Sequence, residues 1–162
     1  MFRKMIREKQ LMSADAIAAV LAGATSGVLA CSGDGDYPYA VPLSYVHFNG
    51  KIYFHSAKGG HKIDAIKKHP RVSFAVIGED TVVGAAYTSF FRSVIAFGQA
   101  RIVQDEAERL AAFRALAEKY SGDQPEASRE KVIARCTQAD IIAIDLEHIT
   151  GKQAAGYVRE QR

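Results

Sequence analysis

Alternating apolar and polar residues predict that most of this chain folds into β-strands. Two turn signals divide its first half: the GDGD segment at 33–36, and Asn49-Gly50, a pair typical of a two-residue hairpin. A later stretch rich in Gly, Ala and Thr is predicted to be a loop between the fourth and fifth strands. The predicted strands are 25–32, 39–48, 51–56 and 71–77, one within 90–104, and one near 141–149.

Apolar residues spaced three and four apart predict three helices among these strands. The first covers 13–22, and Ser13 is its expected N-cap. The last covers 105–120 and begins with Asp105 and Glu108 in a capping-box arrangement. Six strands with hairpin connections and few helices predict a mainly β fold with peripheral helices, built as an antiparallel barrel.

The remaining helix, predicted after Gly60, begins with basic residues where helices usually place acidic ones. Gly59 and Gly60 let a ligand approach the unpaired N–H groups, Ser56 can donate a hydroxyl, and a lysine can neutralise charge. The pattern is compatible with a phosphate site at this helix start, but GGHK matches no phosphate-loop motif, so these residues alone favour basic side chains solvated at the surface. The basic or titratable residues before the first acid, Asp64, are His55, Lys58, His61 and Lys62.

Composition excludes several classes of function. A net charge of +3 is too small for a nucleic-acid footprint. No apolar run reaches the roughly 18 residues that span a membrane, and the basic N-terminal segment has no apolar run after it, as a secretory signal would. Cys31 and Cys136 fit no metal or redox spacing, so we expect free thiols in a cytoplasmic protein. Residues 1–162 are expected to form a single domain with its core at about 13–152.

Motifs for other chemistry are weak in this sequence. The 5 histidines include no pair at a zinc-binding spacing such as H-x-x-x-H, so no metal site is predicted. No serine lies in a G-x-S-x-G motif, and no pair of carboxylates is typical of glycoside hydrolysis.

Three segments, in the predicted order of elements, resemble the FMN-binding split barrel of the pyridoxamine 5'-phosphate oxidase-like superfamily. They are YAVPLSYV at 39–46, IYFHSAKGGHKIDAIKKHPRVSF at 52–74 and FRSVIAFGQARIV at 91–103. Within that superfamily the chain looks most similar to nitroimidazole-resistance-type flavoproteins. The resemblance covers about residues 27–152 and implies a six-stranded antiparallel split β-barrel.

The resemblance also implies FMN as the cofactor, together with the residues that bind it. One strand would run beside the isoalloxazine ring, the basic helix start would hold the phosphate, and the long strand would reach the flavin, often from a partner subunit. For Arg92 the alternative is an exposed arginine on a strand. His55 is the candidate catalytic residue, as a polar group near the substrate. The implied cofactor-binding residues are Val41, Pro42, Leu43, Ser44, His55, Ser56, Ala57, His61, Lys62, Arg92 and Ser93.

The function that the resemblance implies is an FMN-dependent oxidoreductase acting on a small organic molecule such as a nitroaromatic, with a reduced nicotinamide as a candidate donor. The alternative is a non-catalytic flavin- or haem-binding protein of the same fold. Pyridoxamine phosphate oxidases proper carry a Trp- and Arg-rich C-terminal segment that builds the vitamer site. This chain has no Trp and ends in TGKQAAGYVREQR, so oxidation of a vitamin B6 form is not expected.

The long strand within 90–104 predicts a homodimer with flavin sites at the interface. Neighbouring residues on a strand point to opposite faces, so Phe90, Phe91, Val94 and Ile95 cannot all lie inside one small barrel. A second copy related by two-fold symmetry would cover the outward set. The alternative is that the helix at 105–120 folds over the same face and leaves a monomer.

Overall fold

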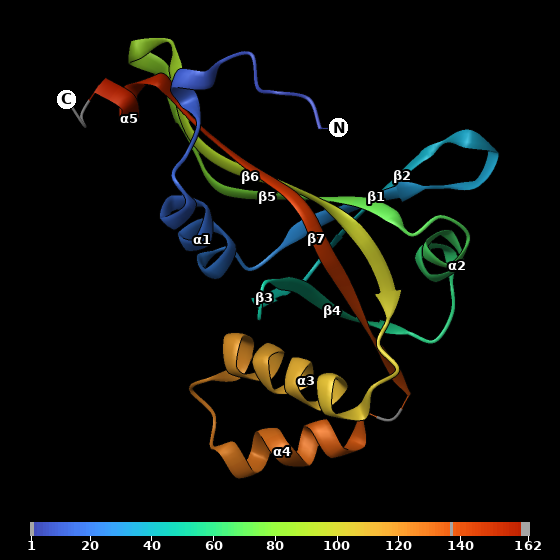
Figure 1. Cartoon of the computed structure of the whole chain (residues 1–162). Helices are drawn as coiled ribbons and strands as arrows, with labels where there is room; N and C mark the ends of the chain where they lie inside the picture. The colour runs from blue at the N-terminus through green and yellow to red at the C-terminus, as the bar shows by residue number, and fades with distance from the viewer. Residues whose placement is uncertain (1, 137, 160–162) are drawn as a thin grey trace.

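The computed structural model, which describes residues 2–136 and 138–159, contains one antiparallel sheet of seven strands with helices around it (Figure 1). The strand order is β2-β1-β5-β6-β7-β4-β3. The strands are β1 (Gly27–Ser32), β2 (Pro38–Leu43), β3 (Val46–Phe48), β4 (Lys51–Ala57), β5 (Arg71–Val83), β6 (Thr88–Ile102) and β7 (Ala139–Gln153). The α-helices are α1 (Ala14–Gly23), α2 (His61–Lys68), α3 (Glu106–Ser121), α4 (Glu126–Arg135) and α5 (Ala155–Arg159). Short 3-10 turns are η1 (Glu8–Gln10), η2 (Asp34–Asp36) and η3 (Gly84–Ala86).

The mainly β class with peripheral helices is confirmed, but the predicted count of six strands is wrong. The stretch predicted as one strand at 39–48 is broken at Ser44 and Tyr45 into β2 and β3, which form the two opposite edges of the sheet. The N–H of Tyr45 donates to the hydroxyl of Tyr120 at 2.9 Å instead of joining a ladder. Among the described residues no ladder joins β2 to β3, so hydrogen bonds do not close the barrel there.

The loop predicted between the fourth and fifth strands is present but much shorter than expected, because it is reduced to η3 and Tyr87. β5 and β6 form one long hairpin whose pairing continues to Val83 opposite Thr88. A β-bulge between Ile77 and Glu79 shifts the alternation of inward and outward residues, which hides the second half of β5 in the sequence pattern. The intervening glycine leaves no room for a side chain, because a Cβ there would lie 2.7 Å from Val20.

Two apolar clusters stabilise the fold. The inner cluster includes the fully buried Phe54 and Phe74 and lies between the sheet and helices α1 and α2. The outer cluster includes Tyr53 and Phe113 and lies between α3, α4 and the strands β3, β4 and β7. Because successive residues of a strand face opposite sides, β4 contributes to both clusters. α3 therefore covers a different part of the sheet from the outward residue Ile95, which is 43% exposed.

The helix ends follow the capping rules that the sequence indicates. The Ser13 side chain accepts a hydrogen bond from the N–H of Ala16 at 3.2 Å. Asp105 accepts one from the N–H of Glu108 at 2.7 Å, as the predicted capping arrangement requires. The pattern did not predict α4, which buries only Ile133 among its described side chains. No helix in the described part of the chain is long and apolar enough to cross a membrane.

Candidate functional site

β2 forms one edge of the sheet, and among the described strands it pairs only with β1. The N–H of Gly33 donates to the carbonyl of Tyr37 at 2.8 Å, so these two residues form a hydrogen-bonded pair at the start of the β1–β2 ladder. In an antiparallel ladder every second pair is hydrogen-bonded, so this contact identifies the others. Val41 opposite Leu29 is such a pair, because hydrogen-bonded pairs alternate along the ladder. Val41 and Leu43 therefore direct their main-chain groups toward β1.

The outer edge of β2 presents the main-chain groups of the alternate residues, Pro38, Ala40 and Pro42. Proline has no N–H, so both prolines occupy positions where no ladder hydrogen bond is lost. The free edge thus offers three carbonyl oxygens but only one N–H, that of Ala40. The backbone here can form hydrogen bonds with the polar edge of a small ligand. The two prolines prevent another strand from pairing with this edge.

The second half of β4 provides another free edge. β3 and β4 are joined by the predicted two-residue turn at Asn49 and Gly50, both of positive φ, and β3 pairs with β4 only as far as Tyr53. By the same alternation, His55 and Ala57 direct their main-chain groups to this side, where β3 has already ended. Only the two residues of the bend connect β2 to β3, so the free edges of β2 and β4 flank one interruption of the sheet (Figure 1).

Helix α2 begins at the far end of this interruption. Its N-cap, Gly60, has φ of 105° and no side chain caps the helix. The carbonyl of Gly60 accepts from the N–H groups of Ile63 and Asp64, which leaves the N–H groups of Gly60, His61 and Lys62 without a partner in the described residues. These groups carry the positive end of the helix dipole. The Lys62 ammonium also forms no hydrogen bond or ion pair with a described residue.

Ser56 lies on the inner side of β4, in alternation with Ile52 and Phe54. It is only 4% exposed, and its hydroxyl oxygen has no hydrogen-bond partner in the part of the chain that the structure describes. A buried hydroxyl without a partner is uncommon and costs free energy, so it indicates a position reserved for a ligand. His55 points to the opposite side and is exposed. The two side chains therefore do not converge, and only the main chain of His55 faces the interruption.

The His61 side chain is already engaged by the β1–β2 hairpin. Its ring stacks on Tyr39 with 4.0 Å between centroids, and its Nε2 lies 3.6 Å from a carboxylate oxygen of Asp34. The stack joins the start of α2 to the first half of β2, which closes the end of the interruption. For an anion at this helix start, the free donors of His61 are consequently its main-chain groups.

Arg92 and Ser93 lie at the other end of the sheet. Arg92 pairs with Glu79, whereas Gln99, seven residues further along β6, pairs with Arg71 just after α2. At about 3.3 Å per residue, roughly 23 Å of strand separates Arg92 from the end of the sheet at which α2 lies in the same chain. Figure 1 shows α2 and α1, against which Arg92 lies, toward opposite ends of the sheet.

The Arg92 guanidinium stacks on the ring of Tyr157 at 4.1 Å, and its Nε is buried without a hydrogen-bond partner. The Tyr157 hydroxyl in turn donates to Glu79. Arg92 is therefore not the freely exposed strand arginine of the alternative interpretation. Ser93 points the other way, onto the outward face of β6 opposite Ile77.

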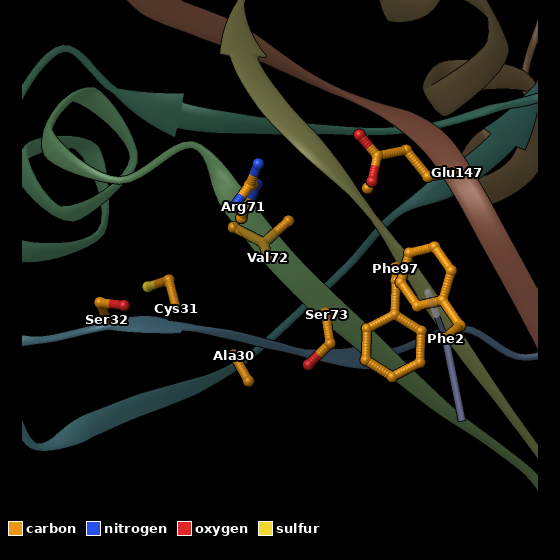
Figure 2. A pocket seen from close by; sticks show the side chains of 10 residues that line it. Phe2, Ala30, Cys31, Ser32, Arg71, Val72, Ser73, Phe97 and Glu147 are labelled. Atoms are coloured by element: carbon orange, nitrogen blue, oxygen red, sulfur yellow. The ribbon is translucent and has the colours of Figure 1, made fainter.

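The outward faces of β1, β5 and β6 form an apolar surface that none of the helices within residues 2–136 and 138–159 covers. Ile77 is 67% exposed, and Ile95, opposite Ala75 in the ladder, is also exposed. An open cavity of about 600 Å³ lies further along the same faces, where the rings of Phe2 and Phe97 meet (Figure 2). No predicted cofactor-binding residue lines this cavity, so its size alone does not identify the functional site.

Both cysteines are free thiols, as predicted. Cys31 lies on the inner side of β1, and burial raises the pKa of its thiol. A thiol in that position is mostly protonated at neutral pH and is a poor nucleophile. Thiol chemistry is thus not supported by the surroundings of Cys31.

The structure adds residues that the sequence interpretation missed. Ala40 provides the N–H of the free β2 edge, and Tyr39 holds the ring of His61. The spacing of Pro38 and Pro42, four residues apart, is the signal that could have identified the outer side of the strand. No local signal predicts the stack of Tyr39 on His61, because it depends on how α2 crosses the sheet.

Known proteins of similar sequence or structure support a family assignment. An uncharacterized protein of Rhizobium meliloti is 36% identical over 67 residues, a match that covers 41% of this chain and 43% of the relative's length. A conserved hypothetical protein of Mycobacterium tuberculosis superposes with a TM-score of 0.79 at 21% identity, over 93% of this chain and 90% of that one.

Two further solved structures are similar. A Bacteroides thetaiotaomicron protein assigned to 5-nitroimidazole antibiotic resistance superposes with a TM-score of 0.73 at 19% identity, over 88% of this chain and 86% of that one. An FAD-binding protein of Mesorhizobium loti gives a TM-score of 0.60 at 25% identity, over 90% and 97%. The resemblance to the pyridoxamine 5'-phosphate oxidase-like superfamily is confirmed, and the similarity to the nitroimidazole-resistance protein is one of fold. Residues 13–153 match the family described as pyridoxamine 5'-phosphate oxidase, and the chain belongs to that family.

Proposed function

We propose that this protein binds FMN between the free edges of β2 and β4, with the phosphate at the start of α2. The observation that carries the proposal is the uncapped start of α2 beside a buried, unpartnered hydroxyl on Ser56. A flavin is favoured over other phosphate ligands because the free edges of β2 and β4 lie beside the same helix start. These edges offer main-chain donors and acceptors to the polar ring that a flavin carries in addition to its phosphate. The FAD-binding relative of the same fold is consistent with a flavin.

The phosphate would be held mainly by the helix start itself. Among the described residues, the main-chain N–H groups of Gly60, His61 and Lys62 have no partner and are free to donate, and the Lys62 ammonium forms no ion pair. Hydrogen bonds to a charged phosphate are about twice as strong as those between neutral groups. Ser56 would donate its hydroxyl to the ribityl or phosphate part of the ligand. His61 contributes through its main chain, because its ring is held by Tyr39 and Asp34.

The isoalloxazine ring has a polar edge that suits the outer edge of β2. There the N–H of Ala40 and the carbonyls of Ala40 and Pro42 are unused, followed by Ser44 at the bend. Val41 and Leu43 support the ring from within the strand through their partly buried side chains. The main-chain groups of His55 and Ala57 line the opposite edge, and the exposed His55 imidazole is the proposed polar group near the substrate.

We place the second half of the site in a second copy of the chain. Arg92 and Ser93 are too far along β6 to reach α2 of their own chain. The exposed apolar surface around Ile77 and Ile95 would be covered by the same surface of a two-fold related copy. Such a homodimer contains two equivalent sites.

When bound, the flavin supplies the redox chemistry, and the protein fixes its position and electrostatic surroundings. The function we propose is reduction or oxidation of a small organic molecule in the cytoplasm, with a reduced nicotinamide as the donor. We expect little turnover of pyridoxamine phosphate, and this stays a prediction. Bleaching of the flavin absorption by a reduced nicotinamide, and its recovery on adding a nitroaromatic, would distinguish an enzyme from a flavin or haem binder.

The phosphate assignment is tested with two lysines of the same helix. Lys62→Ala removes the cation at the start of α2, whereas Lys67→Ala removes an exposed one from its last turn. A charge-assisted contact contributes about 1.5–3 kcal/mol, so Lys62→Ala should weaken FMN binding roughly tenfold or more. Lys67→Ala should leave it unchanged. Flavin fluorescence titrations give both affinities.

Riboflavin, which lacks the phosphate, provides the ligand control. The parent protein should bind it more weakly than FMN, and Lys62→Ala should hardly alter that affinity. If the two lysine variants bind FMN with equal affinity, the assignment of the phosphate to the start of α2 is wrong.

A further inference from the structure

The bend between β2 and β3 is held by one side chain from a distant helix. The hydroxyl of Tyr120, in the last turn of α3, accepts from the N–H of Tyr45 at 2.9 Å. It also lies 2.8 Å from the carbonyl of Tyr45 and 2.6 Å from that of Thr25, just before β1. Its single proton can be donated to one of these carbonyls at a time. One hydroxyl thus joins the bend to the beginning of β1.

Tyr45 itself is the anchor of this bend. Its side chain is 0% exposed, packs edge-on against Phe74 at 5.0 Å, and donates its hydroxyl to the carbonyl of Leu21 at 2.8 Å. The ammonium of Lys119 lies 4.0 Å above its ring and 3.3 Å from the same carbonyl. Consecutive residues at the end of α3 therefore grip the side chain and the backbone of the bend separately.

The bend decides where the free edge of β2 lies. Only Ser44 and Tyr45 separate the last residue of β2 from the first residue of β3, and β3 is tied to β4 by its ladder. A change in the backbone at Tyr45 consequently alters the distance and angle between the β2 and β4 edges. The outer groups of Ala40 and Pro42, a few residues away, move with it.

We propose that Tyr120 is a positioning residue for the flavin ring: its hydroxyl fixes the bend that holds the β2 edge opposite β4. The inference rests on the proposed function and extends it to helix α3, which carries none of the predicted cofactor-binding residues. It assigns α3 a role in the site in addition to covering the outer cluster. Lys119 supports the same bend through the Tyr45 ring.

Tyr120→Phe tests this directly, because it keeps the ring and deletes the hydroxyl. It leaves the N–H of Tyr45 without its partner, and a buried donor without a partner is costly. FMN and riboflavin should both bind roughly tenfold more weakly, by the same factor, because the ring rather than the phosphate is displaced. The visible absorption band of the bound flavin should also shift. Fluorescence titrations and absorption spectra provide the two measurements.

The matched control is Tyr53→Phe. It deletes another tyrosine hydroxyl that ties the sheet to α3, by its hydrogen bond to Glu108 at 2.9 Å, but in the first turn of the helix, at the opposite end from Tyr120. It should leave both flavin affinities unchanged. Should Tyr120→Phe not fold, Lys119→Met is the second variant, with a smaller loss of the same kind. Unchanged flavin affinity in the variant at the bend, or an equal loss in Tyr53→Phe, would overturn the proposal.

Amide hydrogen exchange in the flavin-free protein tests the role of Tyr120 independently of whether the protein binds a flavin. Tyr120→Phe should speed exchange of the Tyr45 amide and of the Leu43 amide, which faces β1, while amides in β5 and β6 keep their protection. If the parent protein binds no flavin, the proposed function fails, and this exchange pattern still reports whether Tyr120 holds the bend. Unchanged exchange at Tyr45 would show that it does not.

Discussion

At the scale of single residues, the alternation of strand side chains decides what each candidate can do. Ser56 faces the interior and His55 faces outward, although they are neighbours in the sequence and both were predicted to bind the cofactor. The sequence could predict that they differ in direction, because the period of a strand is two. It could not predict that the Ser56 hydroxyl lacks a partner, since this depends on every residue packed around it.

Ser56→Ala tests separately what the Ser56 hydroxyl does to the stability of the fold and what it does to FMN binding. An unsatisfied buried hydroxyl costs about 1–3 kcal/mol, so its removal should leave the flavin-free protein as stable as before or more stable. The same change should weaken FMN binding several-fold. Urea unfolding and fluorescence titration measure the two effects, and Ser73→Ala, on the outward side of β5, is the control for both. A destabilised variant with unchanged FMN affinity would show that Ser56 has only a structural role.

At the scale of elements, local signals predicted the helix starts, and long-range contacts decided the rest. Ser13 and Asp105 cap α1 and α3 through atoms three residues away, so the sequence contains the whole explanation. The break of one predicted strand into β2 and β3 depends on Tyr120, 75 residues after Tyr45. No pattern within residues 39–48 could have indicated it, because the partner lies outside that segment.

The other end of α3 is tied to the sheet by charge. Arg101 donates to Glu108 at 2.7 Å and to Asp145 at 2.8 Å, and Lys51 also donates to Asp145. The Arg101 hydrogen bonds lower the pKa of Glu108. Burial acts to raise the pKa of Asp145, but hydrogen bonds from Arg101 and Lys51 outweigh it and the net shift is downward. Both carboxyl groups therefore hold their protons less tightly in the folded than in the unfolded chain.

This network predicts a loss of stability in acid. A group whose pKa is lowered by folding contributes stability above its unfolded pKa, and the contribution disappears as the pH falls through the folded value. The urea midpoint should fall as the pH drops below about 4.5, and Arg101→Ala should lower it at neutral pH and flatten the acid slope. Arg114→Ala, which removes an exposed pair with Glu130, should change little. An acid slope unaltered by Arg101→Ala would contradict this assignment.

At the scale of the whole molecule, the sequence predicted the order of strands and helices better than their closure. Hairpin signals and apolar alternation predict which strands follow one another and pair locally. The interruption between β2 and β4 depends instead on where the two edges of the whole sheet lie, which no local signal contains. The long strand predicted an outward apolar surface, and Ile77 and Ile95 are exposed there. Because Arg92 lies far from α2 in its own chain, the account requires one site to be built from two copies.

Complementation between two defective variants measures this requirement most directly. Lys62→Glu removes the phosphate site at α2, and Arg92→Ala removes the contribution of β6, so each variant alone should bind FMN weakly. When equal amounts are unfolded, mixed and refolded, half of the dimers combine both chains, and each of these contains one intact site. The account predicts that about one quarter of the parental FMN sites return, measured by fluorescence titration. A mixture that binds no more FMN than the separate variants would contradict it.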